Sequence, residues 1–322
     1  MASSLPVRRI LALDGGGIRG IISAIWLEAL EQRLAAAGKG GVRSRFDLIV
    51  GSSTGALIAA GLASAIPPRE LTALYEHFGD EVFPGTVGRL WSRLARTLTE
   101  GLSAPRYSAH GLEAVLQRVF GERTLASASP RLMAIAYDTL TRNPVFFKSF
   151  KAEHASIPLW EVCRAATAAP AYFPAHLTTI EGQRRALIDG GVVANNPTAC
   201  AIAEAVRLNG DERLDQLVVL SIGTGEATRP ISERDATRWG ALEWAIPIID
   251  VLFDGSADAV HYIADQLLPE GRYVRLQAPL LRAYDDFDNV DATNLAALRR
   301  TAEDYLATDA ARKALERLVA LL

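Results

Sequence analysis

The chain has few cysteines, no long apolar run and no excess of positive charge. Cys163 and Cys200 are its only cysteines in 322 residues, so we expect buried thiols in a reducing compartment rather than a disulfide framework. No stretch of about 18 apolar residues is present, so no transmembrane helix is expected. The N-terminus lacks the apolar core of a signal peptide. We therefore expect a cytoplasmic protein that reaches any membrane from the water side.

Its charge balance argues against a polyanionic partner. Lys and Arg together number 34 against 37 Asp and Glu, which gives a formal net charge of −3. Proteins that bind nucleic acid normally carry a basic excess, so no nucleic-acid partner is expected. Hydrophobic residues make up 49% and charged residues 22% of the chain, which is ordinary globular usage. A chain of this length buries a sizeable core without covalent staples.

Apolar periodicity predicts alternating strands and helices. Short apolar runs over 9–13 and 46–50 are each followed by a glycine turn and a helical pattern, which predicts parallel strands with right-handed crossovers. The further expected strands lie over 132–137 and 145–148 as a hairpin, and over 185–188, 217–222 and 273–276. The further expected helices lie over 70–78, 90–98, 108–120, 159–169, 233–268, 291–306 and 309–321. Because no linker composition interrupts them, residues 1–322 are predicted to form a single three-layer α/β/α domain with a central, mostly parallel sheet.

The first glycine turn reads Asp14-Gly-Gly-Gly-Ile-Arg-Gly20. A turn of this kind at the start of a helix presents free backbone N–H groups to an anion. We interpret the free N–H groups of the triple glycine as an oxyanion hole, with Arg19 supplying a nearby positive charge. The same letters satisfy the dinucleotide pattern G-x-G-x-x-G, but that site needs an acid at the end of the second strand. Asp47 instead lies at the start of that strand, so the oxyanion interpretation is favoured.

The second turn, Gly51-Ser-Ser-Thr-Gly55, fits the nucleophile elbow G-x-S-x-G. It falls between an expected strand and an expected helix, which is the context that the motif requires. The glycines at either end leave room for the sharp turn. Ser53, at the centre of this frame, is the predicted nucleophile, and Ser52 is the alternative. A plain tight turn is the competing interpretation, because so short a pattern also arises by chance.

An elbow serine needs a base. The usual base is a histidine in a loop after a late strand, but none of the five histidines has that position: His77, His110, His154, His176 and His261. Asp189 ends an expected strand, and the two glycines that follow leave its carboxylate uncrowded at the sheet edge. A water-poor site narrows the pKa gap between a carboxylate and a serine. We therefore expect Asp189 to be the base, with an ordinary Asp-Gly bend as the alternative.

Together, the three motifs resemble those of the patatin-like phospholipases, a family of lipid acyl hydrolases. The likeness extends to 168–174, 195–197, 221–225 and the acidic stretch 285–289. The resemblance implies a Ser53–Asp189 dyad without a catalytic histidine, and an oxyanion hole formed by Gly16, Gly17 and Arg19. The remaining motif residues would support this geometry: Asp14, Gly15, Gly20, Gly51, Gly55, Gly190 and Gly191.

The resemblance also implies a phospholipid or other acyl-lipid substrate, peripheral membrane contact, and no cofactor. No metal is expected, because Asp285, Asp286 and Asp288 miss the spacing of a calcium loop. The stretch 239–253, with three bulky aromatics, is either a lid or membrane-contact face or an ordinary core helix. Two alternative functions remain. One is a thioesterase or soluble carboxylesterase on the same dyad, and the other is a phospholipase switched on by a ligand that binds within 69–125.

Overall fold

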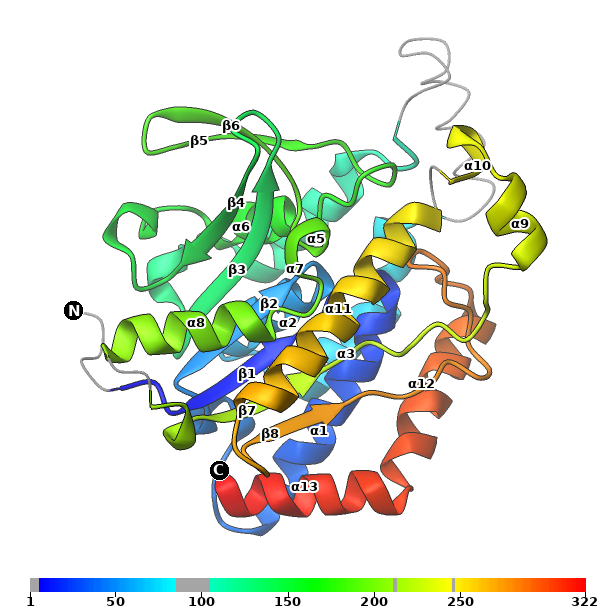
Figure 1. The fold of residues 1–322 in the computed structure, drawn as a ribbon. Coiled ribbons are helices and arrows are strands. Elements are labelled where there is room, and N and C mark those ends of the chain that lie inside the picture. Colours follow the sequence, from blue (N-terminus) through cyan, green and yellow to red (C-terminus); the bar gives the residue numbers. More distant parts are fainter. Residues whose placement is uncertain (1–5, 85–104, 211–212, 245–246) are drawn as a thin grey trace.

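The computed structural model describes residues 6–84, 105–210, 213–244 and 247–322 (Figure 1). Within these ranges, eight strands form one sheet in the order β5-β6-β3-β2-β1-β7-β8, and β4 also pairs with β3. The strands are β1 (Arg9–Leu13), β2 (Leu48–Ser52), β3 (Arg131–Asp138), β4 (Asn143–Lys148), β5 (His176–Ile180), β6 (Gln183–Asp189), β7 (Val218–Ile222) and β8 (Tyr273–Leu276). The expected helix over 90–98 lies outside the described residues.

The centre of the sheet is parallel. β1 pairs with β2 and β7, β2 with β3, and β7 with β8, all in parallel. β4 and β6 run antiparallel to β3, and β5 runs antiparallel to β6. The predicted, mostly parallel sheet and the predicted β3–β4 hairpin are both confirmed. Along β1, Ile10 packs into the core on one face and Leu11 into the core on the other, as expected where helices cover both faces.

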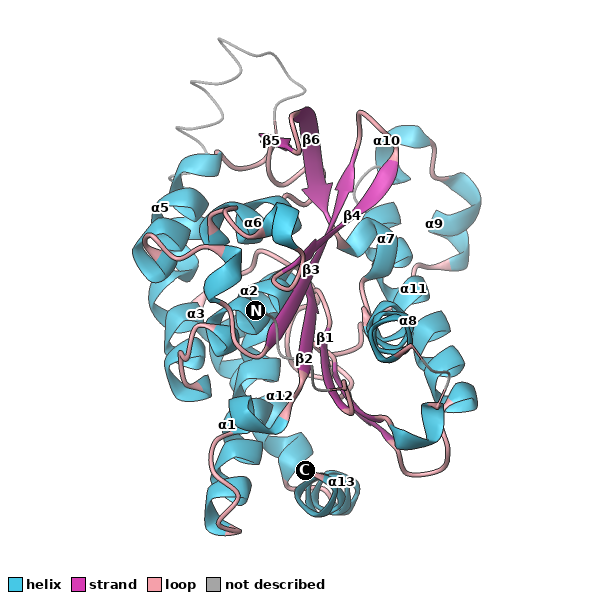
Figure 2. Cartoon of the chain, turned by 90° about the vertical axis from the view of Figure 1, so that its left-hand side faces the viewer, coloured by secondary structure: helices cyan, strands magenta, loops and turns pink. Residues whose placement is uncertain are grey.

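Helices form the two outer layers, which confirms the three-layer expectation (Figure 2). The first layer holds α1 (Gly20–Ala36), α2 (Thr54–Ala63), α3 (Pro68–Val82), α5 (Ala109–Phe120), α6 (Leu159–Ala166) and α12 (Ala292–Leu306). The opposite layer holds α7 (Gly191–Ala194), α8 (Thr198–Asn209), α9 (Glu233–Arg238), α10 (Ala241–Trp244) and α11 (Pro247–Leu267). α13 (Asp309–Leu321) closes the chain. Within the described ranges, no helix combines the length and the apolar character needed to cross a membrane.

Strand register brings two distant segments to the same place in the sheet. Ser52, the last residue of β2, pairs with Ile135 of β3. Asp189, the last residue of β6, pairs with Ala136, the next residue along β3. The ends of β2 and β6 therefore lie at the same level of the sheet, on either side of β3. The turn that leaves β2 and the carboxylate that ends β6 consequently face each other.

Two elements differ from the expected pattern. β5 was not expected, although its Thr178-Thr179-Ile180 run is β-branched and is followed by a two-residue hairpin turn. In that turn Glu181 and Gly182 have φ angles of 53° and 74°. Within the stretch 233–268, where a single helix was expected, the structure describes α9, α10 and α11, and Trp239 and Gly240 separate α9 from α10.

The close approach of the end of β6 to β3 requires a glycine at position 190. A Cβ at Gly190 would lie 2.2 Å from the Ile135 carbonyl oxygen, whereas a Cβ at Gly255 in α11 would meet nothing within 4 Å. We expect Gly190→Ala to lower the free energy of unfolding by about 1–3 kcal/mol, as overpacking does. Gly255→Ala is the matched control, expected to be neutral or stabilising by up to about 1 kcal/mol. Urea unfolding measures both, and equal effects would contradict the steric argument.

Candidate active site

The second glycine turn has the sharp geometry of a nucleophile elbow. Ser53 connects β2 to α2 with φ 50° and ψ −127°, a conformation that non-glycine residues rarely adopt and that costs free energy. A Cβ at Gly51 would lie 2.3 Å from the Gly55 carbonyl oxygen, and one at Gly55 would lie 2.1 Å from the Leu13 carbonyl oxygen. Both glycines are therefore required by close backbone approach.

Ser53 and Asp189 form a buried hydrogen-bonded pair. The Ser53 hydroxyl donates to Oδ2 of Asp189 over 2.6 Å, and the Gly191 amide donates to Oδ1 over 2.7 Å. Asp189 is fully buried, and Ser53 is 6% exposed. Burial raises the pKa of Asp189 to about 7, against the opposing effect of these two hydrogen bonds. A carboxyl group poised near neutral pH suits general-base chemistry.

The first glycine turn leaves two amides free. The Gly15 amide donates to the Asn195 carbonyl, and the Ile18 amide donates to the Phe287 carbonyl. Among the described residues, no acceptor engages the Gly16 or Gly17 amide. Gly17 has φ 56°, which favours glycine. The turn is therefore held at both ends, with two adjacent N–H groups available to an anion between them.

Arg19 and Asp14 lie behind this turn rather than beside Ser53. The Arg19 guanidinium stacks on the Phe287 ring at 4.6 Å and donates to the Asp285 carbonyl. Its burial lowers its pKa. Asp14 pairs with Arg275 at 2.7 Å. Neither Asp14 nor Arg19 is among the described residues that line the pocket containing Ser53. No sequence pattern had pointed to Arg275.

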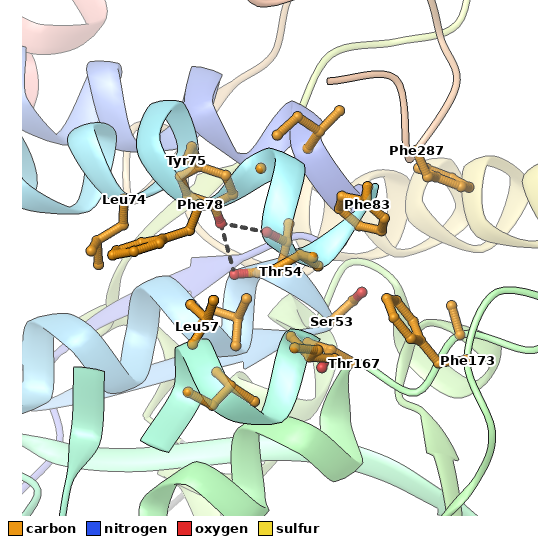
Figure 3. Close-up of a pocket in the computed structure, with 18 of the residues that line it drawn as sticks. Ser53, Thr54, Leu57, Leu74, Tyr75, Phe78, Phe83, Thr167, Phe173 and Phe287 are labelled. Carbon is orange, nitrogen blue, oxygen red and sulfur yellow. Dashed lines mark hydrogen bonds between the residues drawn. The ribbon is translucent and has the colours of Figure 1, made fainter. Parts of the chain in front are cut away.

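Tyr75 links α3 to both turns. Its hydroxyl is hydrogen-bonded to the Thr54 hydroxyl and lies 3.4 Å from the Thr54 carbonyl oxygen (Figure 3). A Cβ at Gly20 would lie 2.5 Å from the same Tyr75 hydroxyl, which explains the last glycine of the first motif. Sequence reasoning missed Tyr75, because one tyrosine on an amphipathic helix carries no distinguishing signal.

Ser53 opens onto an apolar pocket of about 1070 Å³, a volume that includes the solvent space at its mouth. We call this the apolar pocket. Gly17, Ser53 and Asp189 line it, and Figure 3 shows Ser53 close to Phe83 and Phe173. Figure 3 shows Leu74 and Phe78 of α3 on the side of the pocket away from Ser53, and the lining also includes Leu57 of α2 and Leu116 and Phe120 of α5. Such a lining favours an apolar chain over a polar ligand.

The stretch 69–125, for which a regulatory site was one hypothesis, thus contributes residues of α3 and α5 to the lining of the apolar pocket. The five histidines all fall within the described ranges, and none of them lines the apolar pocket. His176, the histidine that came nearest to the expected position, lies in β5 with Nε2 3.7 Å from Glu161. The arrangement therefore places a serine, a carboxylate and Gly17 of the first glycine turn in the lining of an apolar pocket.

The family model for patatin-like phospholipase matches residues 11–202, a span that includes all three motifs. The chain belongs to this family. Patatin-like protein 1 of Arabidopsis thaliana is 30% identical over 336 residues, covering 92% of this chain and 81% of that protein. Patatin-like protein 1 of Oryza sativa subsp. indica is 31% identical over 355 residues, covering 96% and 84%. The chain is therefore a lipid acyl hydrolase at the level of its family.

Among solved structures, the crystal structure of VipD from Legionella pneumophila aligns with 94% of this chain and 67% of its own. Its TM-score is 0.43 and its sequence identity 13%, a likeness too low to support a functional argument.

The raised pKa of Asp189 predicts the pH profile of ester hydrolysis. A base must be ionised to accept a proton, and Asp189 ionises only above about pH 7. We expect kcat/KM to be level above that pH and to fall about tenfold per unit below it. The measurement uses a fluorogenic acyl ester without ionisable groups, so that the substrate does not titrate. A fall in kcat/KM that begins only near the ordinary carboxyl pKa would contradict the assignment of Asp189 as the base.

Proposed function

We propose that the chain is a phospholipase A-type hydrolase that cleaves fatty-acyl ester bonds of membrane lipids through an acyl-enzyme intermediate. The observation that carries the proposal is the 2.6 Å hydrogen bond between Ser53 Oγ and Asp189 Oδ2 at the mouth of the apolar pocket. A serine hydroxyl held by a buried carboxylate has the geometry of an activated nucleophile.

The first half-reaction forms the acyl-enzyme. Asp189 takes the hydroxyl proton while Ser53 Oγ attacks the ester carbonyl carbon. The carbonyl oxygen becomes an oxyanion, which the Gly16 and Gly17 amides bind. Each such donor typically lowers the barrier by about 3–4 kcal/mol. The carbon–oxygen bond to the alcohol then breaks, and Asp189 returns the proton to the leaving oxygen.

The second half-reaction releases the fatty acid. Water gives a proton to Asp189 and attacks the acyl carbon through a second oxyanion at the same amides. Ser53 Oγ leaves and recovers its proton from Asp189. In this scheme Arg19 acts from behind the turn, where its buried charge favours the anionic state.

The apolar pocket favours a long acyl chain over a short one. Each methylene group transferred from water into such a lining contributes about 0.8 kcal/mol. A soluble carboxylesterase or thioesterase would use the same dyad, so the distinction rests on the acyl chain and the leaving group. The depth of apolar wall along α2, α3 and α5 supports the long-chain lipid.

Peripheral membrane contact is the second part of the proposal, and α11 is the surface that supports it. Ile249 and Phe253 of α11 are buried, and Phe253 lines the apolar pocket. On the same helix Ile248, Val251 and Leu252 are exposed by 39%, 43% and 54%. One helix thus carries apolar side chains both to the pocket and to the surface, which is where a lipid leaving a bilayer would enter.

Removing the nucleophile tests the chemistry. In mixed phospholipid micelles we expect Ser53→Ala and Asp189→Asn each to lower the rate of fatty-acid release about a thousandfold or more. Ser52→Ala is the matched control, because Ser52 is buried beside Ser53 and its hydroxyl has no partner among the described residues. Circular dichroism checks the fold of each variant.

The outcomes separate the alternatives. Wild-type release that survives Ser53→Ala would overturn the assignment of the nucleophile, and loss in Ser52→Ala alone would move it to Ser52. Faster turnover of acyl thioesters or short soluble esters than of phospholipid would favour the esterase alternative. Labelling of Ser53 by a fluorophosphonate without lipid turnover would indicate a competent site that needs an activating ligand.

Leu252→Asp tests the membrane surface. Because burying a leucine in lipid contributes about 1.5–3 kcal/mol, we expect the variant to bind phospholipid vesicles roughly ten- to a hundredfold more weakly in co-sedimentation. Leu140→Asp is the control, since Leu140 is 62% exposed but lies in the turn between β3 and β4. Unchanged binding by a folded Leu252→Asp protein, or equal loss in the control, would remove α11 from the contact.

A further inference from the structure

A second cavity lies behind the first glycine turn, and we call it the polar cavity. Its volume is about 510 Å³, including the solvent space at its mouth. It is distinct from the apolar pocket, because Ser53 and Asp189 do not line it. Its polar lining includes Asp14, Arg19, Asn195, Glu226, Asp254 and Asp258. The proposed acyl hydrolysis leaves this cavity without a role.

The position of the polar cavity in the sheet is one where ligands bind. Its lining includes Asp14 just after β1, Thr224 after β7 and Gln277 after β8. β1 pairs with β2 on one side and with β7 on the other, so successive strands diverge from β1 in opposite directions. Open α/β sheets bind ligands at the carboxyl ends of the strands at such a switch point.

Three buried residues of the lining carry polar atoms without partners. Oδ1 of Asp14, Nε of Arg19 and Oδ1 of Asn195 have no hydrogen-bond partner among the described residues. The same three residues are at most 3% exposed. Unpaired buried polar atoms are costly and rare in folded proteins. Two of the three are acceptors and one is a donor, so a ligand that satisfies them must offer both kinds of group.

The charged residues that line the polar cavity favour a cationic ligand. Asp14 is paired with Arg275, but within the described residues no salt bridge engages Glu226, Asp254 or Asp258. Arg19 is the cation among the described lining residues. Burial raises the pKa of Asp254, and the neighbouring Asp258 raises it further while Arg19 opposes. A cationic ligand would offset the cost of ionising Asp254.

The lining also selects between kinds of cation. In the described part of the chain, no group of three or more His, Cys, Asp or Glu side chains is placed to hold a metal ion. A quaternary ammonium is normally recognised by a cage of aromatic rings, and no aromatic residue is among the described residues that line the polar cavity. Carboxylate and amide oxygens instead match an ammonium that carries N–H donors.

We propose that the polar cavity binds a primary ammonium ligand that also carries an oxygen acceptor, with Glu226, Asp254 and Asp258 receiving the ammonium and Arg19 Nε donating to the oxygen. This is the chemistry of an ethanolamine-type lipid head group and of a free amino alcohol.

The polar cavity adjoins the reaction centre through the first glycine turn. A Cβ at Gly15 would lie 2.2 Å from Asn195 Oδ1 and 3.0 Å from Ser53 Cβ, so Gly15 separates the cavity wall from the nucleophile. On the next residue, a Cβ at Gly16 would lie 2.1 Å from Thr224 Oγ1. A ligand in the polar cavity therefore touches the residues that hold the oxyanion turn, whether it arrives as part of the substrate or alone.

Direct binding tests the site without requiring catalysis. Isothermal titration of the full chain with ethanolamine, at fixed ionic strength, is expected to show saturable binding. Choline, which lacks N–H donors, and ethylamine, which lacks the oxygen, are each expected to bind about tenfold more weakly. Asp254→Asn and Asp258→Asn are expected to weaken ethanolamine binding by a similar factor. Asp265→Asn, on the same helix but outside the cavity, is the matched control and is expected to bind as the wild type does.

Three results would overturn the proposal: no saturable ethanolamine binding, equal binding of choline, or equal weakening by Asp265→Asn. Asp258 is exposed, so its substitution tests the carboxylate without removing buried structure. Thermal unfolding of each variant without ligand separates a lost site from a lost fold.

A second measurement identifies the source of the ammonium, and it alone rests on the proposed phospholipase activity. The rates on phosphatidylethanolamine and phosphatidylcholine are compared in matched micelles. A preference for phosphatidylethanolamine that falls toward one in Asp258→Asn assigns the site to the substrate head group. Equal rates, together with ethanolamine binding, assign it to a free amine. Absence of hydrolysis leaves the titration as it stands and counts against the proposed function only.

Discussion

The structure depends on one buried hydrogen bond, that between the Ser53 hydroxyl and the Asp189 carboxylate. Its two residues are 136 positions apart in the chain, and both are shielded from water. Burial has opposite consequences for folding and for chemistry. It makes ionised Asp189 costly to the folded state, and the pKa of about 7 records this cost. The same lack of solvation leaves the carboxylate basic enough to attract the serine proton. In the described part of the chain, the Gly191 amide and Ser53 are the donors to that carboxylate, so little else stabilises its charge.

Several close packing contacts hold Ser53 and Asp189 in place. The elbow keeps Ser53 at a positive φ angle, which is tolerated because Gly51 and Gly55 allow the backbones of β1, β2 and α2 to approach closely. Tyr75 brings α3 onto the elbow at Thr54, so the wall of the apolar pocket and the nucleophile are positioned together. Gly190 lets the end of β6 rest against β3. The strain at Ser53 is thus offset by packing within the sheet and against the helix layer that contains α2 and α3.

The first glycine turn lies between the apolar pocket and the polar cavity. On one side is the apolar pocket, suited to a hydrocarbon chain, and on the other the polar cavity, rich in carboxylates. Arg19 and Phe287 lie at this boundary, with the guanidinium stacked on the ring. A lipid is itself divided into an apolar chain and a polar head, and the reactive ester lies between them. If the first glycine turn binds the oxyanion, as proposed, then the apolar pocket, the proposed reaction site and the polar cavity follow one another in the same order.

Local structure could be predicted from the sequence, because glycine turns, strand periodicity and the placement of a serine between a strand and a helix are properties of short segments. Those patterns predicted the sharp turn at Ser53, the mostly parallel sheet and the three layers, and they put Asp189 at a strand end, while the oxyanion role of the first glycine turn stays a prediction. The antiparallel register of β6 on β3, which brings Asp189 to Ser53, was decided only by the tertiary structure. So were the partners of Asp14 and Arg19, the role of Tyr75 and both cavities. These depend on side chains that converge from elements far apart in the chain, and no local pattern encodes which distant residues will meet.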